Sequence, residues 1–230
     1  MKGDDNMSLL RKRKTDSGSK HIMNVPMLDL RRYVPDALKN IETLNAAIVV
    51  LPKEENRELM VAYGSIPRKN VASEIYVEND SEIKFCNGFS EIDCAVCDEN
   101  TVYFINGFAV IKNAAERTIS VGFNGSIICE NGAKINLIFC NGEAKYVNFK
   151  IKSVKHFSKN LTVDKDFIEN IEDGTVVSCG NILTLPLDVT PDLLKSKKIY
   201  FFAGNTIKCA KRALGTVQTM SFAKDYKTLI

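Results

Sequence analysis

"FCNG" occurs at Phe85–Gly88 and again, unchanged, at Phe139–Gly142. Two related stretches, "INGF" at Ile105–Phe108 and "FNGS" at Phe123–Ser126, lie between them. The four asparagines are separated by 19, 18 and 17 residues, and each follows a run of β-favouring residues. A recurring period of about this length is the sequence signature of a repeat architecture, so the repeat is the first guide to the fold.

The period extends in both directions from this central region. Further asparagines follow at spacings of 19, 21 and 24 residues and precede at spacings of 17 and 25 residues. An asparagine tolerates the positive φ of a tight corner, and stacked amide side chains can hydrogen-bond to one another as a ladder. We therefore predict a structural ladder of nine residues: Asn45, Asn70, Asn87, Asn106, Asn124, Asn141, Asn160, Asn181 and Asn205.

A repeat unit of about 18 residues cannot bury its own apolar side, but it can do so by stacking on its neighbours. The sequence therefore predicts a mainly β protein consisting of a single parallel β-solenoid, right-handed, with about nine coils of 17–25 residues. The alternative is an antiparallel arrangement in which each Asn-Gly pair marks a hairpin turn. Turns in such a meander usually recur every 8–12 residues, roughly half the spacing found here.

Four stretches near the two ends of the repeat region favour short helices on the flank of the coil. Each has Pro or Asp near its start, which suits the first turn of a helix, and apolar residues about three to four positions apart. These stretches are residues 34–44, 51–66, 163–174 and 188–198.

The chain is expected to contain one tail and one domain. Residues 1–24 are polar and charged, include "RKRK" at Arg11–Lys14, and predict a flexible basic tail. Residues 25–230 predict a single solenoid domain. Because an open solenoid leaves unpaired strand edges at both ends, we expect an N-terminal capping helix over Val25–Ile41 and a C-terminal cap over residues 213–230.

The order of strand, asparagine, strand and then helix in the end coils resembles leucine-rich repeats. The purely β middle of the chain resembles a bacterial β-solenoid. The chain has no sustained L-x-x-L-x-L-x-x-N frame, and its unit length varies from 17 to 25 residues. The resemblance therefore implies a repeat protein of this general kind, names no specific family and assigns no functional residue.

Composition limits the classes of partner and compartment. The chain has 31 basic and 28 acidic residues, a net charge of +3 that is too mild to favour nucleic acid as the default partner. Its seven cysteines are odd in number and several lie in apolar runs, which favours reduced thiols. The N-terminus lacks the apolar stretch of a secretory signal, and no apolar run approaches the roughly 18 residues of a membrane span. We expect a cytoplasmic protein.

Cys94 and Cys97 form the one Cys-x-x-Cys pair and are weak candidates for metal binding or thiol exchange. A structural zinc site needs a second pair, and a thioredoxin-type site needs a following helix, which the sequence does not indicate. The two histidines, His21 and His156, do not complete a catalytic set, and His156 is expected to be an exposed strand residue. We expect no metal, no cofactor and no catalytic residue.

A basic stretch between residues 145 and 159 is the candidate anion-binding site. Lys150 and Lys152 alternate with apolar residues, so the lysines are expected to share one outward face. A basic face of this kind suits contact with phosphates or an anionic membrane surface. The structural interpretation is a solvated strand face that discourages edge pairing. The lysines are Lys145, Lys150, Lys152, Lys155 and Lys159.

The sequence favours a non-catalytic structural or protein-interaction solenoid, with a protein partner or self-association. The alternative is a binder of anionic surfaces, nucleic acid or membrane, through the stretch from Lys145 to Lys159. A second alternative is a carbohydrate-active β-helix enzyme that uses clustered carboxylates, for which residues 91–100 and 163–173 are acid-rich. No small-molecule substrate is evident, and we expect no enzyme activity.

Overall fold

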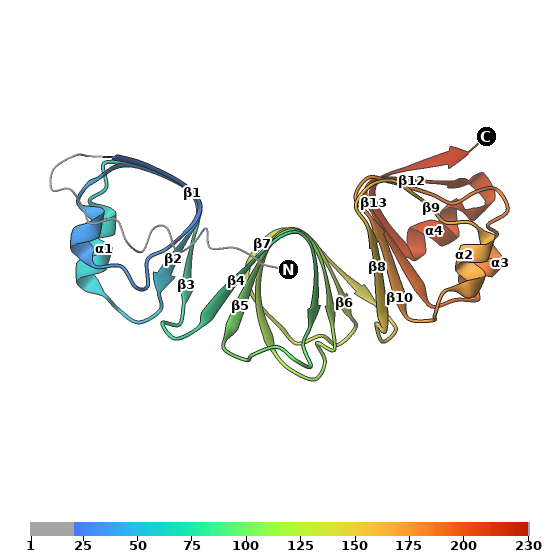
Figure 1. The fold of residues 1–230 in the computed structure, drawn as a ribbon, viewed down its shortest axis with the longest axis horizontal. Coiled ribbons are helices and arrows are strands. Elements are labelled where there is room, and N and C mark those ends of the chain that lie inside the picture. Colours follow the sequence, from blue (N-terminus) through green and yellow to red (C-terminus); the bar gives the residue numbers. More distant parts are fainter. Residues whose placement is uncertain (1–20, 230) are drawn as a thin grey trace. The chain divides into compact units, whose positions relative to one another are not determined.

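The computed structural model describes residues 21–229, and its backbone divides into two compact units at Ser81 and Glu82. The protein is mainly β, and every strand pair in the described chain is parallel. The strands form three sheets, which we call sheets A, B and C in chain order (Figure 1). Each expected ladder residue lies in or beside one of these sheets.

Sheet A has the order β1-β2-β3, with β1 at His21–Asp29, β2 at Ile41–Pro52 and β3 at Arg68–Val77. The 3-10 helix η2 (Pro35–Leu38) joins β1 to β2, and helix α1 (Arg57–Gly64) joins β2 to β3. The Asn56 side chain accepts the Leu59 N–H at 3.0 Å and so caps the start of α1. Leu59 and Tyr63 of α1 are buried in the core of sheet A.

The N-terminal region differs from its prediction. Arg11–Lys14 and the tail up to residue 20 lie outside the described residues, whereas His21–Asn24 begin strand β1. The stretch Val25–Ile41 forms the rest of β1 and the single turn of η2 instead of the expected capping helix. Val25 and residues 27–29 pair with β2, and Leu28 is buried in the core of sheet A.

Sheet B has the order β4-β5-β6-β7 and curves into a half-barrel (Figure 1). Its strands are the longest regular group of the chain: β4 at Glu82–Asp93, β5 at Thr101–Lys112, β6 at Ile119–Glu130 and β7 at Ile135–Val147. Each contains the Asn-Gly pair near its middle, and the glycine has positive φ in all four. The strands bend at these pairs around a core that includes Ile105, Val121 and Phe123.

Sheet C joins β8, β10, β12, β11 and β9 in that order, with β13 also on β12. The strands are β8 at Ser153–Phe157, β9 at Leu161–Thr162, β10 at Thr175–Cys179, β11 at Ile182–Thr184, β12 at Ile199–Ala210 and β13 at Ser221–Leu229. The helices are α2 at Lys165–Asn170, α3 at Pro191–Lys195, η3 at Lys211–Ala213 and α4 at Leu214–Thr219. They contribute Ile168, Leu194 and Val217 to one core. The region where a C-terminal cap is expected contains α4 and β13, and β13 is itself an edge strand of sheet C.

A short helix lies within each of the four stretches in which the sequence indicated one, at η2, α1, α2 and α3. Asp164 and Thr190 cap α2 and α3 by accepting a backbone N–H in the first turn. Pro191 occupies the first position of α3, where its missing N–H leaves no bond unmade.

The prediction of a single β-solenoid is wrong, because the strands form three separate parallel sheets instead of one continuous stack. The central strands of sheet B show a physical reason. In β5, Ala109 and Ile111 belong to one core, Phe108 and Val110 belong to another, and all four are buried. A strand in a solenoid coil buries one face against the interior of the coil. Because β5 is apolar on both faces, its outer face must also be covered, and a single solenoid offers no surface that covers it.

Sheet C covers that outer face. Phe108 of β5 stacks on Phe202 of β12 with ring centroids 3.7 Å apart, and Phe89 of β4 stacks on His156 of β8 at 4.0 Å. Aromatic pairs of this kind add about 0.5–1.5 kcal/mol beyond the area that they bury. Sheets B and C thus pack through their side chains, and the strand ladder is not continued from one to the other.

Candidate interaction site

The asparagines of sheet B form a complete hydrogen-bonded ladder. Strand register places them side by side, and each after the first donates its side-chain amide to the asparagine of the preceding strand. The Nδ2-to-Oδ1 distances are 3.1 Å from Asn106 to Asn87, 2.9 Å from Asn124 to Asn106 and 2.8 Å from Asn141 to Asn124. The ladder ties the corners of the four strands together on the surface.

The glycines that follow these asparagines stack with equal regularity. A Cβ atom on Gly107 would lie 2.4 Å from the carbonyl oxygen of Gly88, and the neighbouring pairs are closer still. Gly142 would place a Cβ 1.8 Å from the Gly125 carbonyl oxygen. With positive φ as well, only glycine fits this row. At Gly88, by contrast, a Cβ would meet nothing within 4 Å, because no strand precedes β4 in the sheet.

The ladder has a direction, and its two ends therefore differ. The Nδ2 group of Asn87 at β4 and the Oδ1 atom of Asn141 at β7 have no ladder partner among the residues that the structure describes. Both strands are outer strands of sheet B, and within residues 21–229 each pairs with one strand only. We call β4 and β7 the open edges of sheet B.

The β7 edge exposes side chains whose counterparts on β6 are buried. Leu137 is 52% exposed and Tyr146 is 54% exposed, whereas Val121 and Cys129, beside them in the register, are fully buried. Cys140 of β7 is exposed beside buried Phe123. The inward-facing columns of sheet B therefore continue to β7 and end there uncovered. A row of unpaired backbone groups with apolar side chains is a template for a further strand.

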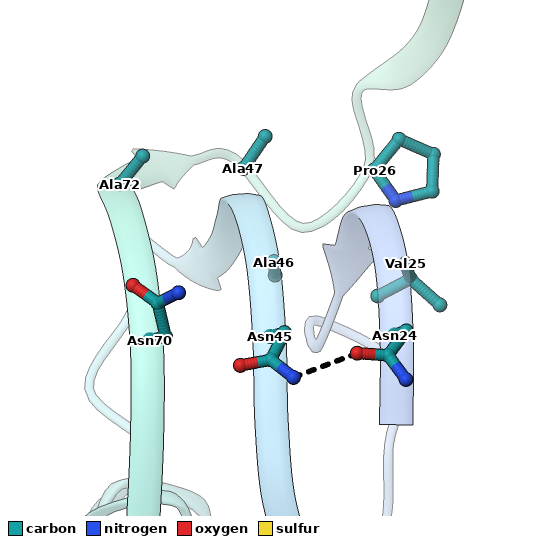
Figure 2. A pocket seen from close by; sticks show the side chains of 8 residues that line it. All are labelled: Asn24, Val25, Pro26, Asn45, Ala46, Ala47, Asn70 and Ala72. Atoms are coloured by element: carbon teal, nitrogen blue, oxygen red, sulfur yellow. Dashed lines mark hydrogen bonds between the residues drawn. The ribbon is translucent and has the colours of Figure 1, made fainter. Parts of the chain in front are cut away.

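Sheet A carries a second, shorter ladder. Asn24, Asn45 and Asn70 are aligned on adjacent strands, and Asn45 donates to Asn24 at 2.7 Å. Figure 2 shows the three amides in a row beside Pro26, Ala47 and Ala72. These residues line a shallow hollow of about 520 Å³. Asn24 is a ladder residue that the sequence reasoning missed. It lies 21 residues before Asn45, within the range of the repeat, and was assigned to the tail.

The last three predicted asparagines do not form a side-chain ladder. Asn160 accepts the Ile182 N–H through its Oδ1 atom at 3.2 Å, and the backbone N–H of Asn205 donates to the backbone oxygen of Asn181 at 3.0 Å. In this region the glycine precedes the asparagine, at Gly180 and Gly204. The nine asparagines are thus distributed over three sheets, and the amide hydrogen bonds found between members of the nine are the three in sheet B. In sheet A, Asn45 bonds to Asn24, which is not one of the nine.

Cys94 and Cys97 lie close together just after β4, and the surroundings of Cys94 favour its neutral thiol. Cys94 is fully buried, and desolvation raises its pKa to about 12. Cys97 donates to the Asp93 backbone oxygen at 3.1 Å and accepts the Tyr103 hydroxyl at 3.0 Å. Nowhere in the described chain do three Cys, His, Asp or Glu side chains gather in a metal-binding group.

The five lysines of the predicted anion-binding stretch do not form one free basic surface. Lys145 lies 2.7 Å from Glu143, Lys150 lies 3.8 Å from Glu116, and Lys152 lies 3.7 Å from Glu172. Lys145 also lies over the Phe222 ring at 4.7 Å. Lys155 and Lys159 are exposed. Most of the positive charge of the stretch is therefore balanced locally.

His156 is a packing residue in this fold. Its Nδ1 atom lies 2.9 Å from Ser178 Oγ, its ring stacks on Phe89, and burial lowers its pKa. Glu130 also has a structural contact: its buried carboxylate accepts the Ile151 N–H at 2.8 Å, beside a hollow of about 390 Å³. This contact gives a hydrogen-bond acceptor to the backbone N–H of Ile151, which lies between β7 and β8.

Comparison of the chain with protein-family models, with curated proteins and with solved structures finds no match. None of the helices in the described part of the chain combines the length and the apolar character needed to cross a bilayer. The open edges of sheet B are therefore the feature with the most specific geometry on which a function can be argued.

Proposed function

We propose that this protein is a non-catalytic structural or protein-interaction module that binds a partner by adding a β-strand to an open edge of sheet B. The observation that carries the proposal is the β7 edge, where exposed Leu137 and Tyr146 coincide with strand groups and an Asn141 amide oxygen that have no ladder partner in the part of the chain that the structure describes. In strand addition, backbone hydrogen bonds supply affinity and alternate side chains supply specificity.

The compartment is part of the proposal. All seven cysteines have free thiols, and four of them are buried in the cores of sheets B and C. Free thiols suit a reducing environment, in which glutathione and thioredoxin keep cysteines reduced. We therefore place the module in the cytoplasm.

Site-specific photo-crosslinking in the source cell tests the proposal. A photoreactive amino acid at Leu137 or Tyr146 samples the β7 edge, and one at Val61 of α1 is the control, because Val61 is equally apolar and 66% exposed but lies on a helix. We expect a discrete protein adduct from both β7 positions and none from Val61. Absence of β7 adducts, or the same adducts from Val61, contradicts the proposal.

A further inference from the structure

We propose that the strand added to β7 is β4 of a second copy of this chain, so that sheet B continues from one molecule into the next. The inference rests on the proposed function and names its partner. The two open edges of sheet B carry the same tetrapeptide, Phe85–Gly88 on β4 and Phe139–Gly142 on β7. One further step of the observed register places these residues side by side: Phe139 beside Phe85, Cys140 beside Cys86, Asn141 beside Asn87 and Gly142 beside Gly88.

The amide ladder favours this order of the two copies. Within sheet B, Asn106, Asn124 and Asn141 each donate to the asparagine of the preceding strand. The free Asn87 donor of one copy therefore meets the free Asn141 acceptor of the other. The opposite combinations, β4 on β4 or β7 on β7, bring two donors or two acceptors together. The ladder thus specifies a head-to-tail contact.

The glycine row has the same direction. At Gly107, Gly125 and Gly142, the carbonyl oxygen of the preceding glycine in the row occupies the position that a Cβ atom would take. Gly88 has open space on that side, and no glycine among residues 21–229 follows Gly142 in the row to receive its carbonyl oxygen. A second copy whose β4 follows β7 fills the space beside Gly88 with the Gly142 carbonyl of the first copy.

The flanking side chains agree with this register. Glu91 of β4 and Lys145 of β7 occupy the same column of the sheet. Glu91 already lies 2.6 Å from Lys112 and Lys145 lies 2.7 Å from Glu143, so the contact brings two ion pairs of alternating charge side by side. In the neighbouring column, exposed Tyr146 meets Ile92. The two surfaces in the contact differ, so the association is heterologous. Such an association adds one molecule after another into a filament unless the molecules close into a ring.

Cysteine trapping in the full-length protein tests both the partner and the register. Strands pair at about 4.8 Å, which lies within the Cα separation of about 4.4–6.8 Å that a disulfide requires. Diamide takes two protons and two electrons from two thiols and leaves a disulfide. We expect diamide to produce a series of covalent multimers on a non-reducing gel, with Cys86 joined to Cys140 in the peptide map.

Two single variants provide the matched control. Cys86→Ser and Cys140→Ser are each expected to abolish the multimers, whereas a mixture of the two is expected to yield a covalent dimer and nothing larger. That result requires one β4 edge and one β7 edge. A Cys140–Cys140 or Cys86–Cys86 product, a Cys86–Cys140 bond within one chain, or no bond at either residue overturns the proposal.

Gly88→Ala gives an independent test that needs no covalent bond. The added methyl group meets nothing within the monomer but occupies the space reserved for the Gly142 carbonyl. We expect the variant to keep the far-ultraviolet circular dichroism of the wild type and to lose its concentration-dependent association in sedimentation velocity. Gly132→Ala is the matched control, because Gly132 also has positive φ (+84° against +73° at Gly88) and also meets no atom within 4 Å, and it is expected to associate like the wild type.

Association of Gly88→Ala at wild-type concentrations overturns the proposal. The photo-crosslinking result separates this failure from failure of the proposed function. Adducts from β7 that contain a different protein, together with an absent Cys86–Cys140 bond, exclude the second copy and retain strand addition. An absence of any β7 adduct excludes both.

Discussion

Asn124 donates its side-chain amide to Asn106 at 2.9 Å across two adjacent parallel strands. Asn124 also accepts the amide of Asn141 at 2.8 Å, so it holds a central position in a ladder with one direction. A directed ladder ends in a donor on one side and an acceptor on the other. The repeat that is visible in the sequence therefore also determines the chemistry of the two open edges of sheet B.

Replacing a central ladder residue is expected to cost more stability than replacing a terminal one. Asn124→Ala removes two amide hydrogen bonds and Asn87→Ala removes one. At roughly 0.5–1 kcal/mol for each surface bond, we expect losses of about 1–2 and about 0.5–1 kcal/mol. Urea unfolding followed by circular dichroism measures both. Equal losses, or a larger loss for Asn87→Ala, would show that the ladder contributes little.

The stacked glycine at Gly125 is expected to tolerate no side chain. Its φ is +131°, and a Cβ would lie 2.0 Å from the Gly107 carbonyl oxygen. Because backbone strain and a backbone clash act together, Gly125→Ala is expected to lose at least about 3 kcal/mol. The control, Gly215→Ala in α4, is expected to be neutral or stabilising by up to about 1 kcal/mol. Thermal unfolding of both variants measures the difference. Similar melting temperatures would contradict the prediction that the stacked glycine tolerates no side chain.

The seven thiols are expected to react at very different rates. Cys140 is exposed, whereas Cys94 and Cys129 are buried and burial raises the pKa of each to about 12. Because the thiolate is the reactive form, pulsed alkylation of the native protein should modify Cys140 first and leave Cys94 and Cys129 unmodified until unfolding. Peptide mapping reads out each site, and Cys140→Ser should remove the fast phase. Modification of Cys94 as fast as that of Cys140 would contradict the packing of sheet B.

His156 is expected to make stability depend on pH. Burial lowers its pKa in the folded protein below the value of about 6.5 that an unfolded chain has. The folded state therefore favours the neutral ring, and this contribution is present above about pH 6.5 and is lost as the pH falls through the folded pKa.

We expect the urea midpoint of the wild type to fall more steeply between pH 7 and pH 5 than that of His156→Phe. The variant retains an aromatic ring against Phe89 and cannot be protonated. Parallel pH profiles for the two proteins would exclude His156 as the group responsible.

The sequence predicted local features of this fold better than the arrangement of its sheets. The Asn-Gly period located the corners of sheet B, and Pro or Asp at helix starts located η2, α1, α2 and α3. The single solenoid failed because "TVYFINGFAVIK" at Thr101–Lys112 is apolar on both faces. Periodicity alone does not indicate which second surface such a strand will cover.

Four of the nine asparagines predicted for the ladder, Asn87, Asn106, Asn124 and Asn141, exchange amide hydrogen bonds. Asn24 was excluded because the polar residues before it suggested a tail, although it aligns with Asn45 in sheet A. Asn181 and Asn205 were included although each follows a glycine instead of preceding one. That reversed order is a signal in the sequence that these two corners differ from those of sheet B.

Hydrogen–deuterium exchange of the full chain, measured against protein concentration, tests the open edges of sheet B most directly. At submicromolar concentration we expect slow exchange in β5 and β6 and fast exchange in β4 and β7, because only the inner strands have partners on both sides. At higher concentration, exchange should slow in β4 and β7 together. Protection of β4 and β7 equal to that of β5 and β6 at the lowest concentration would show that the edges are already paired within the chain, which contradicts the account.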